Sequence, residues 1–316
     1  MGKVIEKGKT PVIFNIERHA LHDGPGIRTL VFFKGCPLNC IWCSNPEGQL
    51  SKPELLFRSR DCISCMRCVR VCPKGAVKVT EDRVMVADDR IIYNDRGLCI
   101  ACGTCVSVCP AGAREIAGRE MLVGEVVDEV LKDEIFYRNS GGGVTVSGGS
   151  PLLWPDFVAE LFNALKRHAV HTAVETCGAV PWDHFEKVLD NTDLFLYDLK
   201  HMDSAKHGKF TGRGNERILE NLELLAQAGA KIIVRVPIIP LFNDNPDDIG
   251  ALARFTMGLS SKPPVQLLPY HTLGRSKYHH LEREYPLERH GLLLVSTLEE
   301  LERTARKINP NTSLEV

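Results

Sequence analysis

The apolar residues of this chain are arranged in two alternating patterns from residue 123 onward. Short β-rich runs are expected to form strands at residues 144–147, 172–175, 194–197, 231–236 and 265–268. Helical spacing fills the gaps between them, for example where Phe157, Leu161 and Leu165 share one face after Pro155, a residue favoured in a first helical turn. Strands that alternate with helices in this way predict parallel βα architecture.

The N-terminal part adds two further strands. Residues 12–16 and 29–33 are β-rich and are separated by the turn-forming sequence Asp-Gly-Pro-Gly at residues 23–26. The last helix is expected to open at Ser296, because Ser296 and Glu299 have capping-box spacing. Together these elements predict an α/β fold, a partial (β/α) barrel with a small insertion.

The insertion is predicted at residues 52–118, where the pattern changes to two similar half-units. Each half-unit is a cysteine run that ends in Cys-Pro and is followed by Gly-Ala, and the two copies lie about 37 residues apart. The barrel is then made of residues 1–51 and 119–316. A chain of 316 residues lies within the range of one such barrel.

Charge and hydropathy exclude several classes of function. Lys and Arg total 39 against 40 for Asp and Glu, with no block of like charge, so neither nucleic acid nor a membrane is an expected partner. No stretch approaches the ~20 apolar residues that span a bilayer. The polar start at residues 1–7 lacks the apolar middle of a signal peptide, and we expect a cytoplasmic protein.

Twelve cysteines in a larger chain without a secretion signal indicate metal binding or redox chemistry. The first group, Cys36, Cys40 and Cys43, supplies three thiolates, one fewer than a closed four-iron cluster needs. An open metal position is the mark of a catalytic site. The alternative is a zinc site completed by His19 or His22.

The other two groups each have the spacing Cys-x2-Cys-x2-Cys-x3-Cys-Pro of bacterial ferredoxins, whose fourth cysteine ligates the other cluster. A pair of zinc knuckles is the alternative. Neither cluster would have an open iron, so electron transfer is the expected role. Cys177 stands alone and is expected to be a small buried residue. The predicted ligand sets are Cys62, Cys65, Cys68 and Cys109 for one cluster and Cys99, Cys102, Cys105 and Cys72 for the other.

The first cysteine group resembles the signature of the radical S-adenosylmethionine (SAM) superfamily, including the aromatic Trp42 just before the third cysteine. The resemblance implies that the open iron chelates the amino and carboxylate groups of SAM. An electron from the cluster then cleaves SAM to a 5′-deoxyadenosyl radical, while the protein supplies geometry and electrostatics.

More of the chain resembles one branch of that superfamily, the activating enzymes of glycyl radical enzymes. The matching segments are residues 22–29, 45–47 (with Asn45), 140–145, 198–200 and 268–271. The resemblance implies hydrogen abstraction from a glycine of a partner glycyl radical enzyme, three [4Fe-4S] clusters, SAM, and flavodoxin or ferredoxin as electron donor. The insertion resembles the subgroup that serves dehydratases, decarboxylases and lyases.

Family analogy also gives expected roles to residues at strand ends. Gly148 and Gly149 would let backbone approach SAM closely. The next residue, Ser150, stands where the family usually has a Glu that receives the SAM ammonium, and a serine brings no charge.

Glu175, Thr176 and Asp198 lie at the carboxyl ends of successive expected strands, where barrel sites gather. In the family such residues bind SAM and, in some members, a monovalent cation. Lys200 and His271 would face the SAM carboxylate.

Two further residues complete the expected site. Arg235 alternates with apolar neighbours and would face the barrel interior, beside SAM, the radical intermediate or a buried carboxylate. Asp23 would hold the glycine-bearing loop of the partner, and a turn-initiating role is the alternative.

Two rival functions remain from the sequence. One is a radical SAM enzyme that modifies a small molecule or another peptide. The other is an electron-transfer ferredoxin fused to an inert barrel, against which the three-cysteine group argues.

Overall fold

The computed structural model describes residues 10–79 and 92–315. The start at residues 1–7, on which the expected lack of a signal peptide rests, lies outside this range. Within it, no helix combines the length and apolar character needed to cross a membrane.

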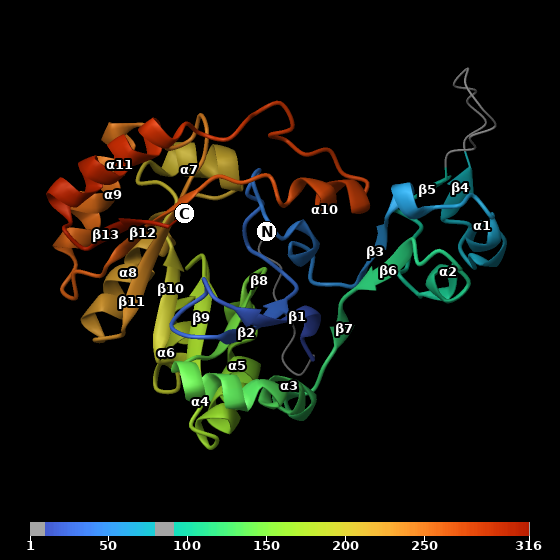
Figure 1. Cartoon of the computed structure of the whole chain (residues 1–316), viewed down its shortest axis with the longest axis horizontal. Helices are drawn as coiled ribbons and strands as arrows, with labels where there is room; N and C mark the ends of the chain where they lie inside the picture. Colours follow the sequence, from blue (N-terminus) through green and yellow to red (C-terminus); the bar gives the residue numbers. More distant parts are fainter. Residues whose placement is uncertain (1–9, 80–91, 316) are drawn as a thin grey trace.

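A nine-stranded sheet forms the framework, in the order β13-β12-β11-β10-β9-β8-β2-β1-β7 (Figure 1). The strands from β2 to β13 in this order run parallel, and β1 and β7 add antiparallel pairs at one edge. The framework strands are β1 (Val12–Ala20), β2 (Arg28–Phe33), β7 (Arg119–Glu120), β8 (Gly143–Gly148), β9 (His171–Thr176), β10 (Leu194–Asp198), β11 (Ile232–Ile238), β12 (Val265–Pro269) and β13 (Thr312–Leu314).

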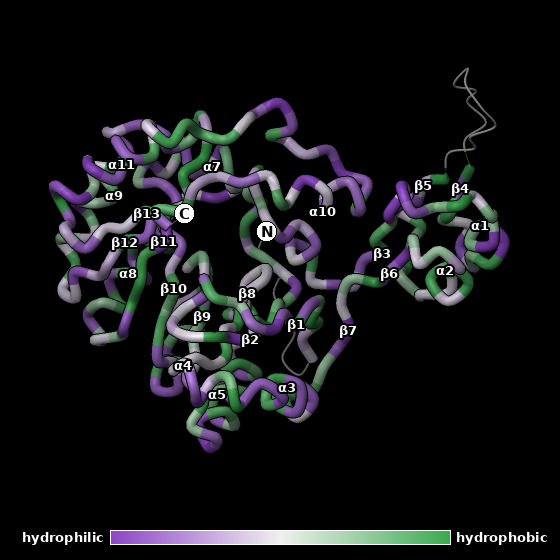
Figure 2. Tube along the Cα trace, in the orientation of Figure 1, coloured by the Kyte–Doolittle hydropathy of each residue, from purple (hydrophilic) through white to green (hydrophobic). Residues whose placement is uncertain are grey.

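Helices follow the parallel strands and cover the outer side of the sheet (Figure 1). In Figure 2 hydrophilic residues follow α11 along the outside of the molecule, while its residues Leu298, Leu301 and Ala305 are buried. The helices of this part are α3 (Val123–Val130), α4 (Glu134–Ser140), α5 (Pro155–Lys166), α6 (Trp182–Leu189), α7 (Ser204–Thr211), α8 (Glu216–Gln227), α9 (Pro246–Gly258), α10 (Arg275–His280) and α11 (Val295–Ile308), with the 3-10 turns η1 (Pro46–Gly48), η3 (Leu131–Asp133) and η4 (Pro151–Leu153).

The predicted α/β fold and all seven predicted strands are confirmed, and Pro155 begins α5 as expected. The predicted opening of the last helix is wrong by one residue. The helix begins at Val295 with Leu294 as its N-cap residue, and no side-chain capping bond occurs there. Ser296 therefore lies inside the first turn, where its hydroxyl cannot cap the helix.

Residues 52–79 and 92–118 leave the sheet and form a small unit that projects from the barrel (Figure 1). It has its own apolar cluster, which includes Leu55, Phe57, Val77 and Ile92. Two two-stranded sheets pair β3 with β6 and β4 with β5. The elements are β3 (Glu54–Phe57), η2 (Ser59–Asp61), α1 (Arg67–Val71), β4 (Val77–Val79), β5 (Ile92–Asn94), α2 (Thr104–Ser107) and β6 (Arg114–Ala117).

Glu282, directly after α10, connects this unit to the barrel. Its carboxylate accepts hydrogen bonds from the main-chain and side-chain nitrogens of Asn94, both at 2.9 Å. Arg96 Nη2 lies 2.8 Å from the same carboxylate. The orientation of the insertion is therefore set by polar contacts as well as by the two chain crossings.

Candidate active site

The first three cysteines lie on a loop that follows β2 at the carboxyl end of the sheet. Main-chain hydrogen bonds frame the start of this loop, from Gly35 N to Gly48 O at 2.7 Å and from Cys36 N to Gln49 O at 3.1 Å. Ser150 N donates to Gly35 O at 2.7 Å and so ties the loop to the end of β8. The sequence places the cysteines here because Gly35, two residues after the end of β2, has φ +98° and turns the chain away from the strand.

Gly148 and Gly149 are needed for this packing. Gly148 has φ +103°, and a Cβ on Gly149 would lie 2.2 Å from Gly35 O and 2.4 Å from Gly48 O. A side chain at residue 149 would therefore push the cysteine loop away from β8. The expected approach to SAM is an additional role that remains a prediction.

The far side of the loop rests on α7. Asn39 N donates to Thr211 O at 2.7 Å, and Ile41 N donates to Phe210 O at 3.2 Å. Trp42 is buried, with its ring centroid 4.7 Å from that of Phe242. The Trp42 side chain thus packs in an apolar cluster that supports the loop.

The thiols on the loop are chemically suited to a metal centre. Burial raises the pKa of Cys40 to about 12 and also raises the pKa of Cys43. A hydrogen bond with Cys177, together with burial, raises the pKa of Cys36 well above its usual value. A metal centre bound by these thiols would take the place of their protons, since thiolates are the ligands. Cys177 is buried, as expected, beside Cys36.

Within residues 10–79 and 92–315, no three His, Cys, Asp or Glu side chains converge closely enough to hold a single metal ion. His19 lies near Ala20, which pairs with Arg28 at the start of β2, whereas the cysteine loop follows the other end of that strand. Its Nε2 is 3.6 Å from Asp133 Oδ1. The structure therefore does not bring His19 to the cysteine loop.

Charged side chains line the interior of the sheet below the loop. Arg235 is only 4% exposed, and its Nη1 lies 2.9 Å from Glu175 Oε1 and 3.3 Å from Asp23 Oδ1. Ser147 Oγ also donates to Glu175. The structure thus brings Asp23, Glu175 and Arg235 together, and it places Arg235 in the interior as predicted.

Lys200 and Asp198 form a second charged pair, closer to the cysteines. Lys200 Nζ donates to Asp198 Oδ2 at 2.8 Å. Burial alone would lower the pKa of Lys200, but the charge of Asp198 and the hydrogen bond to it act in the opposite direction, and the pKa is raised overall. Lys200 therefore keeps its positive charge next to the loop, where an anionic group would be attracted.

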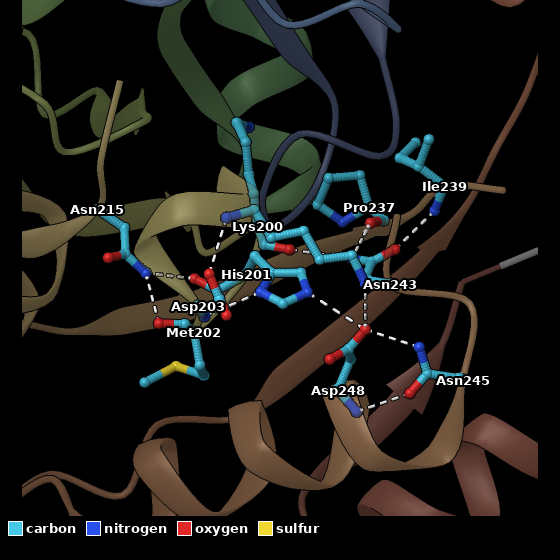
Figure 3. Close-up of polar contacts among 11 residues, drawn as sticks. Lys200, His201, Met202, Asp203, Asn215, Pro237, Ile239, Asn243, Asn245 and Asp248 are labelled. Atoms are coloured by element: carbon cyan, nitrogen blue, oxygen red, sulfur yellow. Dashed lines mark hydrogen bonds and ion pairs between the residues drawn. The ribbon is translucent and has the colours of Figure 1, made fainter. Parts of the chain in front are cut away.

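The backbone at Lys200 is held by a residue that the sequence did not reveal (Figure 3). Asn243 is fully buried, and its Nδ2 donates to Lys200 O at 3.0 Å and to Pro237 O at 2.8 Å. Its Oδ1 accepts from Ile239 N at 2.8 Å. Asn243 thereby joins the chain after β10 to the end of β11. No motif marks it, because an Asn in a turn is ordinary until the fold shows that it is buried.

The next residue along, His201, has a separate network (Figure 3). Its Nδ1 accepts from Asp203 N at 2.9 Å, so the proton of the neutral ring is on Nε2, which lies 3.2 Å from Asp248 Oδ2. Asn245 and Lys206 also donate to Asp248, at 2.6 and 2.9 Å. This network fixes the chain beyond Lys200 to the start of α9.

The remaining predicted residues are dispersed. Thr176 Oγ1 accepts from Gly178 N at 3.1 Å, and Asn45 Oδ1 accepts from Lys277 Nζ at 2.7 Å. His271 has an exposed side chain just beyond β12. Ser150 is fully buried, and its Oγ has no hydrogen-bond partner in the part of the chain that the structure describes.

The insertion contains two cavities lined by cysteines. The structure brings together the same two sets of four that the spacing predicts, each with one cysteine from the other half-unit. The first cavity is lined by Cys62, Cys65, Cys68 and Cys109 together with Arg114, and the second by Cys72, Cys99, Cys102 and Cys105 among mainly apolar residues.

Comparison with known proteins identifies the family. Residues 30–256 match the radical SAM superfamily. The isethionate sulfite-lyase activating enzyme of Nitratidesulfovibrio vulgaris is 44% identical, over 91% of this chain and 92% of that protein. The trans-4-hydroxy-L-proline dehydratase activating enzyme of Clostridioides difficile is 40% identical, over 96% and 99%.

The benzylsuccinate synthase activating enzyme of Thauera aromatica is 45% identical, over 87% of this chain and 83% of that protein. These relatives match across the cysteine loop, the insertion and the barrel alike, because the matches cover most of both chains. The chain therefore belongs to the radical SAM superfamily and, within it, to the activating enzymes of glycyl radical enzymes.

Proposed function

We propose that this protein is an oxidoreductase that activates a partner glycyl radical enzyme, with SAM bound at the Cys36, Cys40 and Cys43 loop. When bound there, a four-iron cluster and SAM supply the radical that takes a hydrogen atom from a glycine of the partner. The observation that carries this proposal is a three-thiol loop, fixed at the carboxyl end of a parallel sheet beside Lys200, in a chain that matches activating enzymes over most of its length.

The interior side chains of the barrel would hold and orient SAM. Lys200 would attract its carboxylate, because the Lys200 charge is retained next to Cys40. Glu175 and Asp198, with Thr176, would receive polar or cationic groups, including a monovalent cation. Arg235 would keep Glu175 in place through their 2.9 Å ion pair. These roles are electrostatic, since none of these groups needs to gain or lose a proton.

The other proposed contacts come from the rim of the same site. The main chain at Gly148 and Gly149 lies against the cysteine loop, and Ser150 places a neutral hydroxyl beside it. Trp42 and Asn45 flank the third cysteine, and His271 follows the end of β12. The ammonium group of SAM would then be held largely by main-chain carbonyls and the open iron.

The insertion would hold two further four-iron clusters and relay electrons from flavodoxin or ferredoxin. Two cavities with four cysteines each support this, since four thiolates close a cluster and leave no iron for SAM. The donor set also excludes most other metals, because sulfur-rich sites favour iron–sulfur clusters and zinc.

The partner would be one glycyl radical enzyme, and Asp23 would help to hold its glycine-bearing loop. The relatives are named for activation of a sulfite-lyase, a dehydratase and a synthase at 40 to 45% identity. Because the sequence identities to the activators of these three partner types are so similar, they do not indicate which type of partner this chain activates. The same family membership argues against an electron carrier fused to an inert barrel.

Anaerobic reconstitution of the full chain tests the proposal. Iron and sulfide analysis should approach three four-iron clusters per chain, and SAM should be cleaved to 5′-deoxyadenosine. With the correct partner present, electron paramagnetic resonance should show a glycyl radical on the partner. Stoichiometric zinc without sulfide would contradict the proposal, and so would SAM cleavage with no radical on any glycyl radical enzyme encoded beside this chain.

A further inference from the structure

Arg114 is a buried arginine at the start of β6 in the insertion. The residue is only 3% exposed. Nη1 donates to Asn94 Oδ1 at 2.6 Å, and Cζ lies 4.4 Å from the centre of the Phe57 ring. Nη2 is buried and has no hydrogen-bond partner among residues 10–79 and 92–315.

Among residues 10–79 and 92–315, the neighbours of this guanidinium do not neutralise its charge. Asn94 and Phe57 are uncharged, and the carboxylate beyond Asn94, that of Glu282, is already engaged by Arg96. Of the other buried cations in the described residues, Lys34, Lys200 and Arg235 each pair directly with a carboxylate. Arg28 instead donates to the Thr145 hydroxyl at 2.6 Å and to Val144 O at 2.7 Å, whereas Nη2 of Arg114 has no such acceptor. Burying a charge without a counter-charge costs free energy. An anion bound at the free Nη2 side of Arg114 would offset this cost.

The free side of Arg114 faces the cysteines. Arg114 lines the cavity of Cys62, Cys65, Cys68 and Cys109. The guanidinium therefore lies beside this set of four cysteines.

We propose that Arg114 is the counter-cation of the cluster held by Cys62, Cys65, Cys68 and Cys109 and raises the reduction potential at which this cluster accepts an electron. This inference rests on the proposed function, in which both cavities hold four-iron clusters. A cluster with four thiolate ligands is an anion, and it becomes more negative when a protein or chemical reductant gives it one electron.

The direction of the effect follows from charge. A nearby cation stabilises the more negative, reduced state, and in a buried site with few polar groups this attraction is screened less than at the surface. Net charge and hydrogen bonds to the sulfurs are among the factors that set the potential of such clusters. The free Nη2 can supply the hydrogen bond as well as the charge. The effect should be greatest for the cluster whose cavity Arg114 lines.

The test compares full-length chains after anaerobic reconstitution, by redox titration with dithionite followed by electron paramagnetic resonance. Arg114→Gln keeps a donor for Asn94 but removes the charge, and it should shift the cluster of the Arg114 cavity to a more negative midpoint potential. Arg70→Gln is the matched control, because it removes an exposed arginine from α1 of the same small unit. The control should leave the potentials unchanged.

Arg114→Lys keeps the charge and should keep most of the potential. Unchanged potentials in Arg114→Gln with full iron content would overturn the proposal, as would an equal shift in Arg70→Gln. If Arg114→Gln loses iron while Arg114→Lys retains it, the charge is needed to hold the clusters, which supports the proposal. If both lose iron, Arg114 has only a packing role and the proposal fails.

Failure of the proposed function would give a different experimental result from failure of the Arg114 proposal. In that case the unaltered chain would already contain iron for fewer than three clusters, before any change at Arg114.

Discussion

The cysteine loop of the barrel and the cysteine cavities of the insertion present similar thiols in opposite surroundings. The loop lies above a polar interior, where Lys200, Asp198, Glu175 and Arg235 pair with one another. The insertion cavities are lined mainly by apolar residues, with the buried Arg114 in the lining of one of them. Similar donor atoms can thus be prepared for different tasks by what surrounds them.

The contrast agrees with the proposed division between SAM binding at the loop and electron relay in the insertion. A site that must receive SAM needs groups for its charges, and the barrel provides both signs at the carboxyl ends of β9 and β10. A site that only passes electrons needs closed coordination and a tuned charge environment. In each region, the number of thiols and the polarity of the lining support the same proposed role. They are two independent reasons to propose SAM binding at the loop and electron transfer in the insertion.

The largest effect is expected when the loop thiols are removed. Replacing Cys36, Cys40 and Cys43 together with Ala should abolish SAM cleavage and leave about two thirds of the iron, since eight cysteines remain for two clusters. Iron analysis and product chromatography measure the two quantities. Residual cleavage would mean that SAM is activated at the insertion, and the contrast between the regions would be lost.

Removing one cluster from the insertion should have a smaller effect. Replacing Cys62, Cys65 and Cys68 with Ala should slow radical formation driven by flavodoxin or ferredoxin, while SAM still binds at the loop. A small strong reductant that reaches the loop cluster directly should restore some cleavage. If a folded variant with an intact loop cluster binds no SAM, then the insertion belongs to the SAM site.

Asn243→Ala should damage the barrel site alone. It removes three buried hydrogen bonds, each with a net value of about 1 kcal/mol, so we expect a loss of about 2 to 4 kcal/mol in stability and weaker SAM binding. Asn309→Ala is the matched control, because Asn309 is also fully buried but donates to Thr256 Oγ1 and Pro263 O near the amino end of β12, away from the cysteine loop. The control should cost about 2 kcal/mol of stability and leave SAM binding intact.

Thermal unfolding and SAM titration of the two variants measure these effects. Equal losses of SAM affinity in both would show that Asn243 does not act through Lys200. A loss of iron from the insertion in either variant would show that the two regions are coupled.

The smallest effect is expected at Ser150. Its hydroxyl is buried without a partner in the described residues, so Ser150→Ala should not lower stability. If the hydroxyl binds SAM, the variant should lose one hydrogen bond, about 0.5 to 1.5 kcal/mol or about a two- to twelvefold rise in Kd. Complete loss of binding at high SAM concentration would show that this hydroxyl replaces a charged group more fully than its chemistry suggests.

The sequence predicted the parts of the molecule that follow local rules. The seven strands were visible because β-branched and apolar residues recur in short runs, and the cysteine sets were visible because ligand spacing is a local property. The order of β7 and β13 at the sheet edges was not visible, since β7 has two residues and β13 has three.

The contacts between distant segments were also beyond prediction. Asn243 and Lys200 are far apart in sequence, and so are Asn94 and Glu282, and no periodicity marks such pairs. The burial of Arg114 could not be predicted for the same reason, because an Arg at the start of a strand is normally exposed. Burial and partners, which decide the role of a polar residue, are properties of the complete fold.

The main-chain frame of the cysteine loop has a consequence for how the protein acquires its iron. The bonds from residues 35–41 to Gly48, Gln49, Thr211 and Phe210 involve no cysteine side chain, so the loop should already have its shape in newly made protein. A scaffold protein that delivers a cluster would therefore find the cysteine loop already in its final conformation. In the insertion the thiols are part of the small apolar core, so folding and metal uptake should be one event. Iron shortage should therefore expose the insertion to proteases first, while the barrel survives and can be loaded later.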